Sequence, residues 1–147
     1  MNKETCEELL STWLTISAIL RNERIVKILT FREVCICNIL NHEGKDCDIT
    51  ATDITDRTGM LKSQANKVLN DMESKGLIMK VRNESDKRKI NIFITKKGRD
   101  IYKKEHEGIL HILDQVCTSI GQEKITSFIK DLNDLTDVLK QINPSKE

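Results

Sequence analysis

Two short segments with the composition of β-strands interrupt a chain whose other apolar residues repeat with helical spacing. Residues 77–82 and 89–94 are rich in Ile, Val and other apolar residues, and the polar residues 83–88 separate them. The segments before and after them place apolar residues at intervals of three and four. We therefore expect a mainly α-helical protein of the α+β class with a two-stranded β hairpin.

Six helices are predicted around this hairpin from caps and periodicity. Thr30 with Glu33, and Thr50 with Asp53, match the capping box, in which the side chain and backbone amide of two residues bond reciprocally. Gly76 follows a basic residue at the end of a helical pattern, where glycine commonly closes a helix. The predicted helices, the first capped by Thr5 and the fifth by Thr95, span residues 5–28, 30–41, 50–58, 62–75, 95–119 and 122–142.

The length and the cysteine content favour one domain in a reducing compartment. A chain of 147 residues has the usual size of one domain, and no repeat or linker divides it. No apolar run approaches the roughly 20 residues of a membrane span, and the acidic start does not resemble a secretory signal. The odd number of five cysteines argues against a secreted disulfide framework. We expect one cytoplasmic domain over residues 1–147, with free thiols and no membrane contact.

The net charge of +1 hides a strongly uneven distribution along the chain. Residues 57–104 contain fourteen Lys and Arg but five Asp and Glu, which gives this segment a net charge of +9. The other residues, with ten basic and eighteen acidic side chains, carry −8. One basic block in a nearly neutral protein indicates a localised site for a polyanion.

The basic block has the order of elements of a winged helix-turn-helix. Two short helices joined by a tight glycine turn precede the basic hairpin, and a helix fits the DNA major groove while a hairpin tip reaches the flanking phosphates or the minor groove. Gln64 and Asn66 have the chemistry to read adenine, but they lie two apart and are not expected to read bases equally. The candidates for DNA contact are Lys62, Ser63, Gln64, Asn66 and Lys67 on the helix, and Arg82, Lys87, Arg88 and Lys89 on the wing.

Apolar residues of the first and sixth helices indicate a dimerisation region. The first helix is apolar on more than one face, and the sixth carries a heptad seam. An ordinary core within one chain is the alternative, since periodicity does not identify the partner. The candidate dimerisation residues are Leu9, Leu10, Trp13 and Ile16, and Ile125, Phe128, Leu132, Leu135 and Leu139.

The residue pattern resembles the MarR family of bacterial regulators. Residues 49–69 resemble its helix-turn-helix, and residues 72–78 its helix end of the type Glu-x-Lys-Gly-Leu-Ile. Asp86-Lys87-Arg88 resembles its wing signature Asp-x-Arg, residues 94–98 its Leu-Thr-x-x-Gly, and residues 29–33 the start of its second helix. The resemblance implies a winged DNA-binding lobe over residues 30–98 and a helical dimerisation region from residues 1–29 and 99–147.

The resemblance also implies a function and a partner. Members of the family are homodimers that bind a pseudo-palindromic operator in double-stranded DNA, usually as repressors released by a small molecule or by oxidation. Three departures stand out: Leu61 replaces the usual Ser or Thr cap of the recognition helix, Glu33 stands where Gln is common, and residues 64–66 replace a Thr-Val-Ser/Thr run. The last departure is expected to change the DNA sequence that is read.

Cys6 and Cys117 are the candidates for redox sensing. Cys6 lies in a first helical turn, where the helix dipole lowers a thiol pKa, although neighbouring glutamates oppose this. Cys117 lies near the end of the fifth predicted helix, in the same dimerisation region. Peroxide-sensing members of the family carry tyrosines around their sensor, whereas Tyr102 is the one tyrosine here. Small buried or unreactive thiols are the default expectation, and redox sensing is the alternative.

No residue pattern indicates catalysis, a cofactor or a metal. The chain has no Gly-rich phosphate loop and no arrangement of nucleophile, base and oxyanion donors. Glu107 and His111 are four apart on a predicted helix but lack a third metal ligand. We expect a homodimeric repressor released by a small-molecule effector; the alternatives are a redox-sensing regulator of the same fold and a winged-helix module that binds protein instead of DNA.

Overall fold

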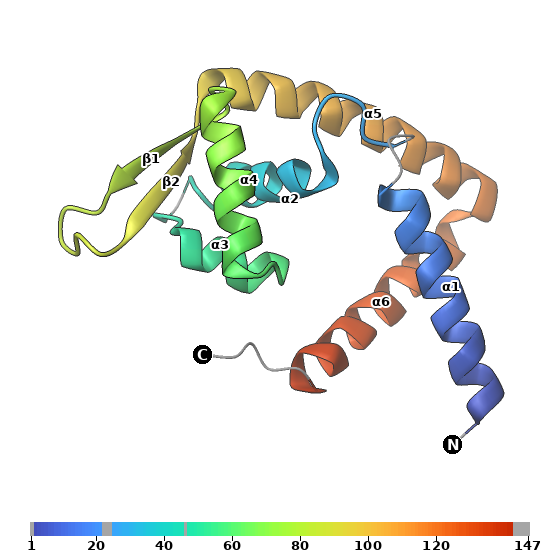
Figure 1. Cartoon of the computed structure of the whole chain (residues 1–147). Coiled ribbons are helices and arrows are strands. Elements are labelled where there is room, and N and C mark those ends of the chain that lie inside the picture. The colour runs from blue at the N-terminus through green and yellow to red at the C-terminus, as the bar shows by residue number, and fades with distance from the viewer. Residues whose placement is uncertain (1, 22–24, 46, 143–147) are drawn as a thin grey trace.

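The computed structural model describes residues 2–21, 25–45 and 47–142 of the chain (Figure 1). Within these residues the elements follow one another in the predicted order, and the two strands form one antiparallel sheet. The expected fold class is therefore confirmed. The elements are α1 (Lys3–Arg21), α2 (Phe31–His42), α3 (Ala51–Thr58), α4 (Lys62–Ser74), β1 (Ile78–Arg82), β2 (Ile90–Ile94), α5 (Lys96–Ile120) and α6 (Gln122–Ile142).

A buried apolar core joins α2, α3, α4 and the hairpin, and the first turns of α5 close it with Tyr102. We call α2, α3, α4 and the hairpin together the winged lobe. Burial of such side chains contributes roughly 1.5–3 kcal/mol each relative to leaving them in water. The most completely buried members of the core are Ile36, Ile49, Ile54, Leu69, Met72, Ile78 and Ile92.

The predicted caps form and fix the ends of the helices of the lobe. The Glu33 amide donates to Thr30 Oγ1 at 3.3 Å, and the Thr30 amide donates to Glu33 Oε2 at 2.9 Å. Thr50 and Asp53 bond in the same reciprocal way at the start of α3. Gly76 takes φ +73°, so the Leu77 amide donates back to the carbonyl of Met72 and closes α4. In the lobe, α5 and α6, the elements end within one residue of the predicted positions.

The predicted first helix is wrong at both ends. Helix α1 begins at Lys3, so Thr5 lies inside it and does not cap it, and residues 22–24 lie outside the described residues. Residues 25–30 are bends and turns rather than helix. The reason is tertiary, because a distant carboxylate takes the amides that a helix would use.

That carboxylate belongs to Glu105 of α5, which is only 4% exposed. Its Oε1 accepts from the Lys27 amide at 2.7 Å, and its Oε2 accepts from the amides of Ile28 at 2.7 Å and Leu29 at 2.9 Å. Val26 and Leu29 are buried beside this contact. Residues 27–29, just before α2, are therefore clamped to α5.

Helices α1 and α6 lie away from the winged lobe and expose apolar side chains (Figure 1). No described residue of α6 is buried, and on α1 Trp13 is 46% exposed. None of the helices in the described residues is both long enough and apolar enough to cross a membrane.

Replacing the clamp carboxylate, Glu105→Ala, is predicted to destabilise the fold by about 2–4 kcal/mol, because three amides lose their acceptor in a poorly hydrated place. Urea unfolding at one fixed protein concentration measures this difference. Glu107→Ala is the matched control, since Glu107 lies exposed two residues further along the same helix. Equal unfolding midpoints for the two variants would contradict the clamp.

Candidate nucleic-acid interface

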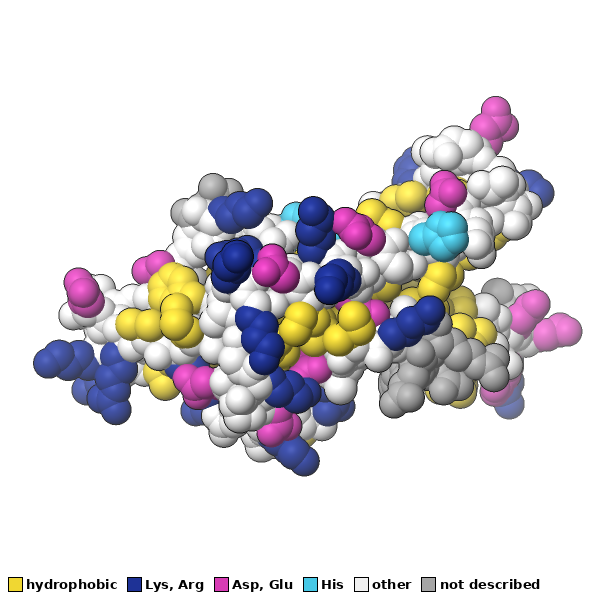
Figure 2. Space-filling model, turned by 90° about the horizontal axis from the view of Figure 1, so that it is seen from above, with side chains coloured by type: hydrophobic (Ala, Val, Ile, Leu, Met, Phe, Trp, Pro, Cys, Tyr) yellow, Lys and Arg dark blue, Asp and Glu magenta, His cyan; other side chains and the backbone are white. Residues whose placement is uncertain are grey.

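The basic block does not form one surface. Most of its members lie on α4, on the hairpin and on the first turns of α5. Seen from above, Lys and Arg side chains are scattered over the molecule rather than gathered in one patch (Figure 2). Two of the cations on α5 hold the fold together: Arg99 donates to the carbonyl of Ile94 at 3.0 Å, and Lys97 donates to the carbonyl of Lys75 at 2.7 Å. The charge available to a ligand is therefore concentrated on α4 and the hairpin.

The first two turns of α4 present a row of polar side chains to solvent. Ala65 and Leu69 face the core at 1% exposure, so the intervening positions of the helix turn outward. A helix with such a face has the dimensions and the hydrogen-bonding groups to read the major groove. The five candidates for base contact, Lys62, Ser63, Gln64, Asn66 and Lys67, are all exposed on this face.

The start of α4 lacks the usual Ser or Thr side chain that caps the helix amides. Leu61 occupies the cap position in an extended conformation, and its side chain has no acceptor for the helix amides. Instead Gln64 Oε1 accepts from the Leu61 amide at 3.2 Å. Sequence reasoning missed this second use of Gln64, although its place three residues after the cap was the signal.

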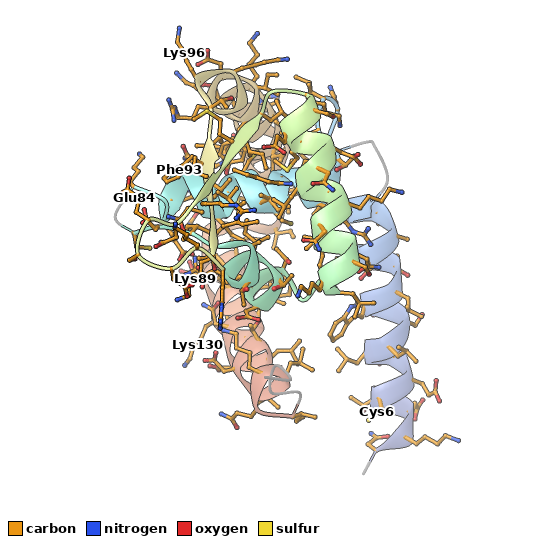
Figure 3. The ribbon with its side chains drawn as sticks, turned by 60° about the vertical axis from the view of Figure 1, so that its left-hand side comes forward. Cys6, Glu84, Lys89, Phe93, Lys96 and Lys130 are labelled. Atoms are coloured by element: carbon orange, nitrogen blue, oxygen red, sulfur yellow. The ribbon has the colours of Figure 1, made fainter. Side chains whose placement is uncertain are left out.

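The wing is a tight hairpin whose tip is held by side chains of its own. β1 and β2 pair from Ile78 with Ile94 to Arg82 with Ile90. At the tip, Asp86 Oδ1 accepts from the Arg88 amide at 3.0 Å, so Asp86 braces the backbone of Arg88. Figure 3 shows Glu84 and Lys89 on the projecting hairpin. The four wing candidates, Arg82, Lys87, Arg88 and Lys89, are all exposed.

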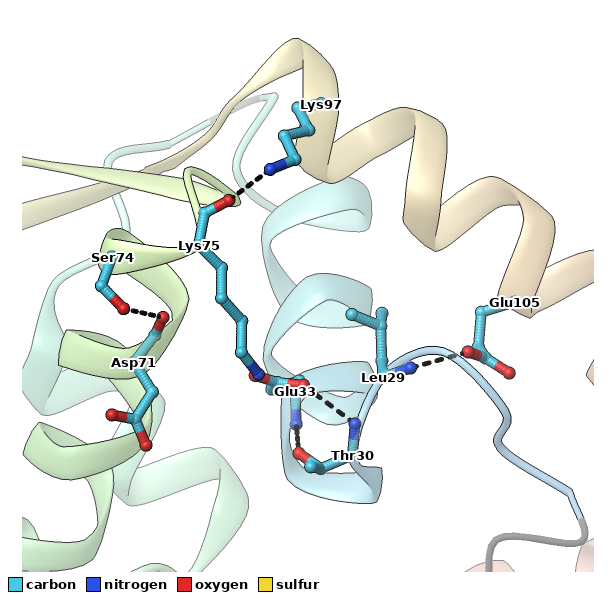
Figure 4. A network of polar contacts seen from close by, with 8 residues as sticks. All are labelled: Leu29, Thr30, Glu33, Asp71, Ser74, Lys75, Lys97 and Glu105. Carbon is cyan, nitrogen blue, oxygen red and sulfur yellow. Dashed lines mark hydrogen bonds and ion pairs between the residues drawn. The ribbon is translucent and has the colours of Figure 1, made fainter.

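Two ion pairs fix α4 relative to its neighbours. The half-buried Lys80 of β1 contacts Asn70 and, at 3.5 Å, Glu73, which ties the wing to the outer side of α4. At the end of α4, Lys75 donates to the buried Glu33 at 2.6 Å (Figure 4). Glu33 therefore caps α2 with one carboxylate oxygen and accepts a hydrogen bond from Lys75 with the other. A glutamine at this position would carry no charge to pair with the lysine.

An open groove of about 510 Å³ lies beside the turn between α3 and α4. Its walls come from the start of α2, with Arg32 and Cys35, and from the turn, with Met60. Gln64 also lines it, so the groove reaches one of the candidate reading residues.

The candidate dimerisation residues lie outside the winged lobe, on α1 and α6. On α1 all four are exposed, and on α6 Phe128 and Leu132 are exposed while Ile125, Leu135 and Leu139 are half-buried. Their apolar faces are thus only partly covered within one chain.

All five cysteines are described, and each is a free thiol. Cys6 is exposed near the start of α1 (Figure 3), and Cys117 is half-buried near the end of α5. Burial, with the negative charge of Glu33, raises the pKa of the Cys37 thiol to about 12, and burial also raises the pKa of Cys35. These two thiols are therefore poor nucleophiles at neutral pH.

Across the described residues, no three His, Cys, Asp or Glu side chains come together as a metal site. Of the two residues weighed as metal ligands, Glu107 lies within 4.0 Å of Lys103, and His111 contacts Gln115 at 3.3 Å.

Comparisons with known proteins agree with this geometry. The family model described as MarR family matches residues 29–89, which is most of the winged lobe. Among curated proteins, no sequence matches the chain significantly.

Solved structures match along nearly the whole chain. FabT of Streptococcus pneumoniae, solved in complex with DNA, is 26% identical with a TM-score of 0.68, and the match covers 97% of this chain and 99% of that one. A MarR family protein of Bacillus stearothermophilus is 26% identical with a TM-score of 0.73, over 95% and 99%. BpsR of Bordetella bronchiseptica, whose DNA binding is regulated by 6-hydroxynicotinic acid, shares the fold at 14% identity and a TM-score of 0.75, over 93% and 96%.

The exposed polar face of α4, the basic wing braced at its tip and the family model, which ends at Lys89 just before β2, agree with one another. The chain is therefore similar to MarR family transcriptional regulators, over residues 29–89 by the family model and along nearly its whole length by structure.

Proposed function

We propose that the protein is a homodimeric repressor that binds a pseudo-palindromic operator and is released from it by a small-molecule ligand. The observation that carries the proposal is the exposed polar row on α4 beside a basic wing that is tied to the same helix. Residues 30–98 form the DNA-binding lobe in this proposal, and residues 1–29 and 99–147 the dimerisation region. Such a regulator acts where the DNA is, in the cytoplasm.

Within the lobe we assign specificity to α4 and affinity to the wing. Asn66 is exposed on α4 and, like Gln64, presents the amide that pairs with adenine N6 and N7. Lys87 and Arg88 at the wing tip neutralise phosphates or enter a narrow minor groove. Because Gln64 also caps α4, its reading of a base requires that it leave the Leu61 amide.

The exposed apolar faces outside the lobe support a dimer. Helix α1 has 19 residues, and most of the stability of a helix in a protein comes from the packing of its apolar face. Leu9, Leu10 and Trp13 of α1 and Phe128 of α6 are each close to half exposed in the single chain. Apolar surface of this extent marks an interface, and a second copy of the chain carries the same seam.

The groove beside the turn between α3 and α4 supports release by a small molecule. It combines the cationic side chain of Arg32 with apolar walls, which suits a small organic anion, and it touches Gln64. BpsR offers a precedent for such regulation in a protein of the same fold. Release by oxidation is the alternative, and exposed Cys6 with half-buried Cys117 are its candidates.

DNA from upstream of the protein's own gene is predicted to bind in a mobility-shift assay, with an affinity that falls steeply as salt increases. Arg88→Ala should weaken specific and non-specific binding alike and lower the salt slope by about one. Asn66→Ala should instead relax the preference at one base pair, at a cost of about 1–3 kcal/mol. Gln64→Glu keeps the cap acceptor but adds a negative charge, so its base preference rather than its overall affinity tests base reading by Gln64 separately from helix capping.

Lys130→Ala is the control for charge, because Lys130 lies on α6, outside the lobe. Unchanged affinity for both the Arg88 and the Asn66 variants would refute the assignment of roles. Absence of any shift at low salt would favour a module that binds protein. A shift abolished by oxidant alone, and restored by reductant, would favour the redox alternative.

The purified protein is predicted to sediment as a dimer, and Leu132→Glu should raise its dissociation constant by at least about 100-fold, because a charge replaces an apolar side chain in the proposed seam. Asn133→Glu is the matched control, with the same new residue one position along α6. A monomeric wild type, or equal dissociation constants for the two variants, would contradict the proposed dimer.

A further inference from the structure

Asn91 of β2 is a buried polar side chain that neither the helix caps nor the ion pairs explain. It is 6% exposed, and the other two buried polar residues in the described chain are Glu33 and Glu105, whose partners are given above. A buried amide persists when it is hydrogen-bonded at both ends. Its neighbours are Asp48, in the connection before α3, and Asn83, at the start of the wing tip.

These side chains form a continuous relay. Asn91 Nδ2 donates to Asp48 Oδ2 at 3.1 Å, and Asn91 Oδ1 accepts from Asn83 Nδ2 at 3.3 Å. Asn83 Oδ1 in turn accepts from the amides of Ser85 at 2.9 Å and Asp86 at 3.0 Å. The orientation of both amides follows from the ends of the relay, because a carboxylate can only accept and a backbone amide can only donate.

The relay connects a rigid part of the lobe to the wing tip. Asp48 precedes Ile49, which is 1% exposed and whose carbonyl accepts from the Ile92 amide at 2.8 Å. At the other end, Asp86 accepts from the Arg88 amide and so links the Arg88 backbone to the relay. The backbone of Arg88 is therefore held through side chains as far away as the residues before α3.

We propose that Asn91 is a positioning residue for the wing, and that the relay from Asp48 through Asn91 and Asn83 orders the tip before DNA is bound. The inference rests on the proposed DNA-binding function and adds the reason why the wing can hold Arg88 in place. A tip that is ordered in advance loses less conformational entropy when it contacts phosphates.

The first test needs no DNA. Backbone order parameters from ¹⁵N relaxation should be near 0.85 at Arg88 in the wild type and fall below about 0.6 in Asn91→Leu, which removes both contacts of the amide without adding charge. The order parameters of the α4 backbone should stay unchanged. Arg88 order equal to wild type in this variant would overturn the inference, whatever the protein binds.

The second test uses a substitution whose electrostatic effect on DNA binding is opposite in sign to the effect expected from loss of the relay. Asp48→Ala removes a negative charge, which by electrostatics alone strengthens DNA binding, whereas loss of the relay weakens it by about 10-fold. Hydroxyl-radical protection of the minor groove under the wing should be lost, and protection of guanine N7 in the major groove should persist. Asp48→Asn removes the same charge but keeps an acceptor oxygen for Asn91, so it should bind DNA at least as tightly as the wild type.

The outcomes separate the two proposals. If the wild type binds DNA and Asp48→Ala binds as well or better with full minor-groove protection, the relay has no positioning role and the DNA-binding function stands. If the wild type binds no DNA, the proposed function fails, and the order parameters of Arg88 alone decide whether the relay orders the tip. If Asn91→Leu does not fold, Asp48→Ala, at an exposed position, carries both measurements.

Discussion

Two buried carboxylates join segments that are far apart in the sequence, and the position of α2 and α4 relative to α5 depends on both. Glu105 accepts from amides 76 to 78 residues earlier, and Glu33 caps α2 while pairing with Lys75, 42 residues later. A carboxylate taken out of water costs several kcal/mol unless donors replace the water. Each acid must therefore keep its donors in place. The start of α2, the end of α4 and the first half of α5 consequently behave as one unit.

The parts of this fold that the sequence predicted well are those set by neighbours along the chain. Thr30 with Glu33 opens α2, and Gly76 closes α4, because a cap is completed within three or four residues. The hairpin was equally predictable, since strand composition and a polar tip are local features. The exposed row on α4 follows from the same helical period that buries Leu69.

The features that the sequence did not predict depend on contacts between distant residues. Glu105 has the same appearance in the sequence as Glu107, yet the first is a buried clamp and the second is exposed. Residues 27–29 do not belong to the first helix because their amides bind that clamp, which no local propensity reveals. The role of Asn91 likewise depends on Asp48, 43 residues away.

These contacts restrict how a ligand can release the proposed dimer from DNA. The end of α4 is fixed by Lys75 and its outer side by Lys80, so α4 cannot tilt without breaking ion pairs within the lobe. A change in the distance between the two lobes of the proposed dimer costs less free energy, because it leaves those pairs intact. Such a change would move the lobes out of register with the half-sites of a palindromic operator. The groove at the start of α2 lies directly after the clamped residues 27–29. In the proposed dimer, a ligand in this groove would be placed to change the angle between the winged lobe and the dimerisation helices.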